Sequence, residues 1–174
     1  MTPTGAGGLP ADLRADCAAC AGLCCVALPF DAEQGFGFDK PAHQPCRHLK
    51  PDYRCAIHGS LADDGFPGCA AFECFGAGQW VTQHLFAGQS WRDTPATLGA
   101  MCEAFFAQRA LHETMAMLAL AETRCTDAAL AARLGEERER LMAARHAAFD
   151  LAALQRPARA LLAEFAQTAV PPRL

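Results

Sequence analysis

The feature that most constrains this sequence is a cluster of cysteines in its first half. Eight of the ten cysteines fall between residues 17 and 74. They are Cys17, Cys20, Cys24, Cys25, Cys46, Cys55, Cys69 and Cys74. A single free cysteine is ordinarily a small buried apolar residue, but no apolar core needs eight of them so close together. Clustered thiols bind soft metals readily, so the segment is expected to hold a metal ion or an iron–sulfur cluster.

The spacing of the first four cysteines supports metal binding. Cys17 and Cys20 are separated by two residues, which lets a tight turn aim both sulfurs at one ion. Cys24 and Cys25 are adjacent, and the backbone points adjacent side chains apart. We therefore expect this pair either to serve two different metals or to divide into one ligand and one packing residue.

The later cysteines repeat the pattern of close pairs. Cys55 is followed three residues later by His58, and Cys69 and Cys74 form another close pair, with Cys46 preceding both. His58 is expected either to ligate the metal or to hydrogen-bond to a ligand. The eight cysteines and His58 are thus the candidate metal ligands, and no residue is assigned a catalytic role.

Two cysteines lie outside this cluster. Cys102 shares a helical face with Leu98 and Phe105, so it is expected to pack in a core. Cys125 falls at the end of a predicted helix, and its role stays open.

Net charge and hydropathy limit the partners and the cellular compartment that we expect for this protein. The net charge of −4 argues against a broad nucleic-acid surface, and no apolar run approaches the ~18 residues of a membrane span. The opening residues have neither the basic nor the apolar region of a signal peptide, so a cytoplasmic protein is expected. In a reducing compartment, dense cysteines favour metal ligation over a disulfide framework.

The chain changes character near residue 93. Residues 1–93 are rich in Gly, Pro, Cys and Phe, whereas residues 94–174 are rich in Ala, Leu, Glu and Arg with helical periodicity. Thr94 and Pro95 predict a helix start, and Thr126 or Asp127 predicts a second one. Pro157 is expected to break or restart the pattern before a last helix.

These patterns predict a mainly α fold. An irregular cysteine-rich metal-binding segment, residues 1–93, is expected to pack on a small antiparallel helical bundle, residues 94–174, as one compact unit. In this arrangement the helices cover the aromatic side chains of the first segment.

The ordered motifs resemble a known family. The run from Cys17 to Cys25 is followed by P-C-R-H-L at 45–49, C-A-I-H at 55–58 and F-P-G-C at 66–69. This order resembles the CxxCxxCC cysteine-cluster proteins, also described as a zinc- or iron-chelating domain. Here three residues rather than two precede the double cysteine, His58 replaces the usual tyrosine, and Gly65-Phe66 stands where the family has arginine before proline.

The resemblance implies a metal-binding function. Some family members are described as iron–sulfur proteins, including a flagellin lysine methylase. The stretch from D-L-R-A-D-C to C-F-G-A-G-Q also resembles the leading module of actinobacterial pentapeptide-repeat proteins, in which a cysteine module precedes the repeat array.

Several functions fit the cysteine pattern. The first is a protein whose thiolates hold an iron–sulfur cluster, of the [4Fe–4S] type, in an accessory or structural role. The alternatives are a structural Zn²⁺ protein and a metal storage or delivery protein. A cluster-dependent enzyme ranks last, because no loop for NAD, flavin or S-adenosylmethionine is visible. The expected partners are the metal and a protein partner, without nucleic acid or membrane.

Overall fold

The computed structural model describes residues 8–146 and 150–169. Within these ranges the chain is mainly helical, as expected, and it contains no β-strand beyond two isolated bridges, Phe30 with Lys40 and Leu49 with Cys55. None of the helices in the described part combines the length and the apolar character needed to cross a membrane.

The chain divides into two compact units, which are considered separately. Ala15–Arg109 form what we call the cysteine unit, and Met1–Arg14 with Ala110–Leu174 form the helical unit. The change of unit falls inside a long helix, α4 (Leu98–Arg124), whereas the change of composition falls near residue 93.

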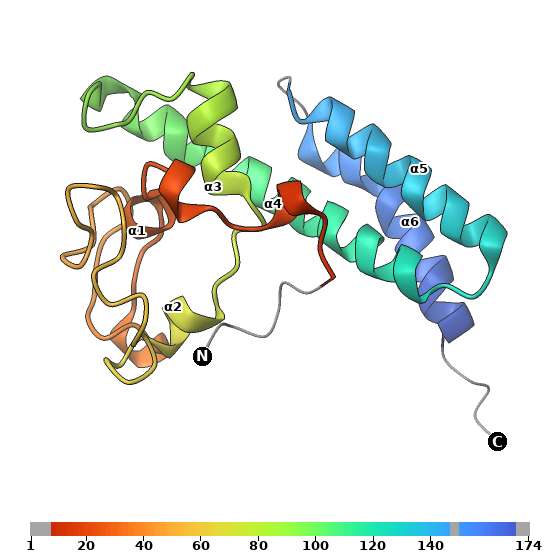
Figure 1. Ribbon diagram of the computed structural model, residues 1–174, viewed down its shortest axis with the longest axis horizontal. Coiled ribbons are helices and arrows are strands. Elements are labelled where there is room, and N and C mark those ends of the chain that lie inside the picture. The colour runs from red at the N-terminus through yellow and green to blue at the C-terminus, as the bar shows by residue number, and fades with distance from the viewer. Residues whose placement is uncertain (1–7, 147–149, 170–174) are drawn as a thin grey trace. The chain divides into compact units, whose positions relative to one another are not determined.

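The helical unit contains the later part of α4, α5 (Ala128–Ala144) and α6 (Leu151–Ala169). Helices α5 and α6 lie side by side and run in opposite directions (Figure 1). The start of α5 is capped as predicted, because the Asp127 carboxylate accepts hydrogen bonds from Ala129 N at 2.9 Å and Leu130 N at 3.1 Å. Leu134 and Leu141 of α5 are fully buried.

The expected break at Pro157 is wrong. Helix α6 runs through this proline from Leu151 to Ala169. Proline lacks the N–H that would bond four residues back, and its ring disturbs the preceding turn. Arg140 of α5 donates from its Nη2 to the carbonyl of Leu154 at 2.7 Å, next to the Ala153 carbonyl whose helical donor the proline removes. A neighbouring helix thus supplies a donor in the turn that the proline disturbs.

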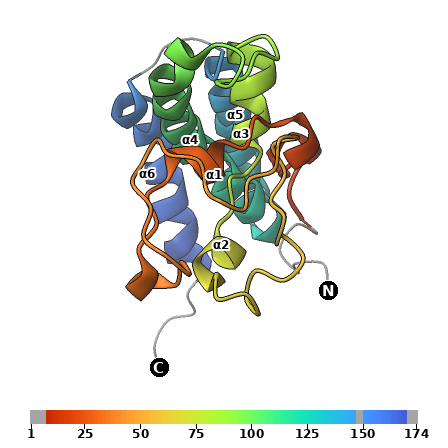
Figure 2. The same cartoon turned by 90° about the vertical axis from the view of Figure 1, so that its left-hand side faces the viewer.

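The cysteine unit is built from short elements. Its helices are α1 (Leu23–Ala27), α2 (Pro67–Ala71) and α3 (Ala77–Trp80), with a π-helical turn (Val81–Leu85) after α3. Single 3-10 turns occupy Cys17–Ala19, Ala32–Gln34 and Pro95–Thr97. Long irregular stretches connect the short helices (Figures 1 and 2).

The first part of α4 supplies one wall of this unit's core. Met101, Cys102 and Phe105 are fully buried, which confirms the expected packing role of Cys102. The remaining buried core residues are Ala21, Leu23, Val26, Ala27, Phe30, Cys46, Leu49, Ala77, Val81 and Trp91. The helix start predicted at Thr94 and Pro95 proves to be a 3-10 turn leading into α4, and the Thr94 side chain makes no cap.

Candidate metal centre

Backbone N–H groups two residues further along the chain lie beside four of the candidate cysteines. The sulfur of Cys46 accepts from the His48 N–H, with an N–S distance of 3.4 Å. Backbone N–H groups also act to lower the pKa of three other thiols, against the larger effect of burial: Cys20 through Leu23 and Gly22, Cys55 through Ile57, and Cys74 through Gly78 and Gly76. In each case one donor lies two residues after the cysteine. Such N–H groups stabilise a thiolate in preference to a thiol, so the turns are suited to charged sulfur.

Glycine makes the first of these turns possible. Gly22 has φ of +69°, a left-handed conformation that other residues adopt only with strain. A Cβ at this position would also lie 2.8 Å from Leu49 Cδ1 and 3.2 Å from the carbonyl oxygen of Tyr53. The turn that directs N–H groups at Cys20 therefore depends on glycine at position 22.

Gly78 lies against two thiols at once. Its N–H donates to the sulfur of Cys74, and a Cβ built on it would lie 2.7 Å from the sulfur of Cys20. A side chain at position 78 would thus occupy space beside the Cys20 sulfur. This glycine lets the backbone of α3 approach two sulfurs that are far apart in sequence.

The adjacent cysteines lie on α1, with their sulfurs 3.9 Å apart. Both are partly exposed. The carbonyl oxygen of Cys25 accepts a hydrogen bond from Cys46 N at 2.9 Å. Helix α1 is therefore bonded to the Cys46 turn, while its own first N–H groups face Cys20.

The surroundings of the thiols favour their protonated form. Burial raises the pKa of Cys20 to about 12, and it raises the pKa of Cys17 to about 11 with further contributions from Cys24 and Cys74. Burial also raises the pKa of Cys69 to about 11. These thiols are protonated at neutral pH in the metal-free chain, so a metal ion has to displace their protons.

The thiols differ in the charged side chains that lie near them. Asp16 and Glu73 are acidic neighbours that further raise the pKa of Cys17. Lys40, by contrast, is a buried lysine whose ammonium donates to the carbonyls of Leu28, Pro41 at 3.0 Å and Gln44 at 2.8 Å.

Burial lowers the pKa of Lys40, and nearby thiolates oppose that shift. The largest of these opposing contributions comes from Cys46, followed by Cys25. A cation fixed at this position partly neutralises negative sulfur.

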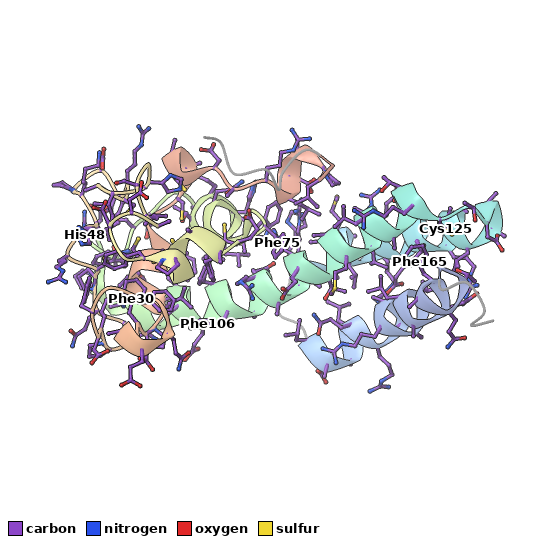
Figure 3. The ribbon with its side chains drawn as sticks, turned by 90° about the horizontal axis from the view of Figure 1, so that it is seen from below. Phe30, His48, Phe75, Phe106, Cys125 and Phe165 are labelled. Carbon is purple, nitrogen blue, oxygen red and sulfur yellow. The ribbon has the colours of Figure 1, made fainter. Side chains whose placement is uncertain are left out.

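The histidines take different places. His58 is exposed. The ring of His48 packs edge-on against Phe66, with centroids 5.3 Å apart, and His48 lies at one end of the cysteine unit (Figure 3).

All ten cysteines are free thiols. Cys125 lies at the end of α4 in the helical unit, away in sequence from the clustered thiols (Figure 3). Across residues 8–146 and 150–169, no group of three or more His, Cys, Asp or Glu side chains is already arranged so that it could hold a metal ion. The sulfurs have the donor chemistry and the turns of a soft-metal site, but ligation requires them to converge further.

The sequence did not reveal Lys40 or Gly78 as parts of this region. Lys40 carries no pattern that separates it from a surface lysine, since its burial depends on three carbonyls from different turns. Gly78 follows Cys74 in a glycine-containing stretch that by itself predicts only a turn. Its position two residues after Gly76 and four after Cys74 is the signal that could have suggested a backbone approach to sulfur.

Comparison with known proteins gives one informative match. The chain is 49% identical over 104 residues to the uncharacterized protein YybG of Bacillus subtilis strain 168, which covers 60% of this chain. The chain spans only 37% of the length of that relative. No family model matches, and no solved structure matches.

Proposed function

We propose that the cysteine unit is a metal-binding module whose thiolates hold an iron–sulfur cluster, in an accessory or structural role. The observation that carries this proposal is the set of N–H groups directed at Cys20, Cys46, Cys55 and Cys74. Hydrogen bonds to thiolate sulfur stabilise its charge, and in iron–sulfur proteins they tune the cluster.

The donor set favours sulfur throughout. Among the candidate ligands only His58 is not a cysteine, and its side chain is exposed rather than gathered with the thiols. Cys46 and Cys20 lie instead among buried apolar residues such as Leu49 and Val26. A site with four or more thiolates and an apolar surround suits a [4Fe–4S] cluster, which also requires a reducing compartment such as the cytoplasm.

A structural Zn²⁺ site is the second candidate. Tetrahedral zinc sites use the same thiolates and the same tight turns. The irregular cysteine unit has only short helices, and a metal would cross-link it. No cofactor loop suggests an enzymatic use of the metal.

The decisive experiment is anaerobic purification of the full chain, followed by analysis of iron, sulfide and zinc and by a visible absorption spectrum. Iron and acid-labile sulfide in equal amounts, with a brown colour, are expected. Zinc without sulfide would contradict the iron–sulfur cluster and support the structural Zn²⁺ site instead. Absence of any stoichiometric metal, both as purified and after anaerobic reconstitution, would contradict metal binding altogether.

A matched pair of variants controls for non-specific thiol binding. Cys46→Ser removes a buried thiol within the cysteine unit, and Cys125→Ser removes a partly exposed thiol at the far end of α4. Metal content should fall in the first variant and stay unchanged in the second. Equal loss in both would indicate adventitious binding.

A further inference from the structure

We propose that Cys24 and Cys25 form a dithiol site that binds one thiophilic atom through both sulfurs, and that the ligand it fits is a trivalent arsenical. The four cysteines whose turns support the proposed function are other residues, so this site goes beyond that function and does not depend on it. The site needs only two side chains, and both come from α1.

The distance between the two sulfurs fits a single shared atom. The sulfurs of Cys24 and Cys25 lie 3.9 Å apart. Two sulfurs that bind one tetrahedral atom with bonds of about 2.3 Å, the usual Zn–S length, are about 3.8 Å apart. Bonds from sulfur to arsenic are of similar length. One atom can therefore bond to both sulfurs with little movement of either side chain.

Both thiols lie away from the buried face of α1. Leu23, Val26 and Ala27 follow the three- and four-residue spacing of one helical face, and all three are buried. Cys24 and Cys25 fall between them in sequence and are partly exposed. Neither thiol is enclosed in the core, so a small ligand can reach the pair.

Buried hydrogen bonds fix the chain just before the pair. The Trp91 side chain donates from Nε1 to the carbonyl of Ala21 at 2.8 Å, and Ala21 N donates to the Thr82 hydroxyl at 3.0 Å. Trp91 and Thr82 are themselves buried. Gly22 then takes the left-handed conformation from which α1 begins. The entry to the helix is therefore held by two side chains that are distant from it in sequence.

Further hydrogen bonds hold the backbone of the pair itself. Cys25 N donates to the carbonyl of Gly22 at 3.0 Å, and the carbonyl of Cys25 accepts from Cys46 N at 2.9 Å. Binding to side chains on a fixed backbone costs less conformational entropy than binding to a mobile loop. The pair is thus pre-organised for a chelating ligand.

A trivalent arsenical that carries one organic group matches such a pair. In phenylarsine oxide the arsenic keeps its bond to carbon, and its bonds to oxygen are exchanged for two bonds to sulfur. The two thiol protons leave with that oxygen as one water molecule, and no atom is oxidised or reduced. Because the second As–S bond closes a ring, the pair should bind about 10²–10⁴-fold more tightly than a single thiol.

The test uses phenylarsine oxide and the full chain, purified anaerobically with a phosphine as the reductant. One equivalent is added, the free thiols are alkylated, and both modifications are mapped by mass spectrometry. The adduct should lie on Cys24 and Cys25, which then resist alkylation together. The chain unfolded in guanidinium is the reference, because there Cys17 and Cys20 should compete for the reagent. An adduct in the native chain that is distributed as in the unfolded chain, or that joins other cysteines, would overturn the inference.

Single serine variants measure the contribution of each thiol. Cys24→Ser and Cys25→Ser should each retain the arsenical at least about 100-fold less well against a competing free dithiol, because the ring cannot form. Cys17→Ser is the matched control in the preceding turn, and its retention should equal that of the wild-type chain. Tryptophan emission checks that each variant is folded, since Trp80 and Trp91 are buried. Unchanged retention in either variant of the pair would contradict a shared site.

Metal analysis of the same preparation keeps this inference separate from the proposed function. A chain that carries iron and sulfide, or zinc, but forms no adduct at Cys24 and Cys25 would overturn the dithiol site alone. An adduct at the pair in a chain that binds no metal would overturn the proposed function and leave the dithiol site intact.

Discussion

The two units differ in how the polar groups of their backbones are hydrogen-bonded. In the helical unit, long helices such as α5 and α6 bond their own N–H and C=O groups, and leucines such as Leu134 fill the space between them. In the cysteine unit the helices before α4 are short, and the longest run joins α3 to its π-helical turn, from Ala77 to Leu85. Its turns are joined instead by side chains that bond to distant backbone, such as Trp91 Nε1 to the carbonyl of Ala21 at 2.8 Å.

This difference indicates what each unit needs to fold. Helices shorter than about 12 residues are marginal on their own, so the stability of the cysteine unit depends on tertiary bonds and, under our proposal, on metal. The helical unit needs only its apolar stripes and caps. Metal and helix packing can therefore be removed one at a time, and removal of the metal should have the largest effect.

Complete metal removal should unfold the cysteine unit selectively. Structural metal binding contributes about 10–16 kcal/mol to folding in small zinc domains. This is as large as the whole free energy of unfolding of a typical domain, about 5–15 kcal/mol. Both tryptophans of the chain, Trp80 and Trp91, are buried in this unit. Chelation under anaerobic conditions should therefore shift tryptophan emission to the red, while much of the far-ultraviolet circular dichroism, which α5 and α6 dominate, persists. Unchanged emission after verified metal loss would contradict this dependence.

Acidification should weaken the metal sites next most strongly. The pKa values of Cys17 and Cys69 are raised to about 11 in the metal-free chain, so metal binding releases their protons. Each released proton makes binding weaker by about 1.4 kcal/mol for every unit by which the pH falls, or about 5 kcal/mol for a four-thiolate site. The apparent affinity, measured by competition with a chelator between pH 8 and 6, should drop steeply once chelator protonation is corrected. An affinity independent of pH would mean that the ligands are not these thiols.

A core truncation in the helical unit should destabilise that unit without releasing metal. Leu134 is fully buried on α5, so Leu134→Ala should cost about 2–5 kcal/mol of unfolding free energy. The matched control is Met117→Ala on α4, because Met117 is 45% exposed; it should change stability by less than about 0.5 kcal/mol. Circular dichroism during urea unfolding measures both. Loss of metal in Leu134→Ala would show that metal binding by the cysteine unit depends on the stability of the helical unit.

The smallest effect is expected at a helix cap. Asp127→Ala removes the carboxylate that accepts from Ala129 N and Leu130 N, and should cost about 1 kcal/mol. Asp127→Asn keeps an acceptor oxygen and should recover most of the loss. The midpoint of thermal unfolding, followed by circular dichroism, distinguishes the two variants. Equal loss in both would assign the effect to charge rather than to the cap.

The sequence predicted the helical unit more accurately than the cysteine unit. Apolar periodicity and the cap at Asp127 follow local rules, and the structure agrees with them. The break at Pro157 was wrong because the compensating donor, Arg140, comes from another helix. Sequence rules that consider only neighbouring residues include the destabilising effect of a proline. They do not include a hydrogen bond from a side chain of another helix.

For the candidate metal centre, the sequence identified clustered thiols with the donor chemistry of a soft-metal site, but not which of them lie close together. The knuckle spacing of Cys17 and Cys20 is local and visible in the sequence. The approach of Gly78 to Cys20, and of the Cys46 turn to Cys55, depends on bonds between residues far apart in sequence or on conformations such as that of Gly22. Such pairings have no periodic signature, so spacing alone does not predict them.

The burial of Lys40 has an electrical consequence for any metal that the thiols hold. Its ammonium, fixed by three carbonyls, influences the side of Cys46 and Cys25, whereas Asp16 and Glu73 face Cys17. The reduction potential of an iron–sulfur cluster depends on the charge around it. Under our proposal, a cluster that lies nearer Lys40 would be easier to reduce than one that lies nearer Asp16 and Glu73.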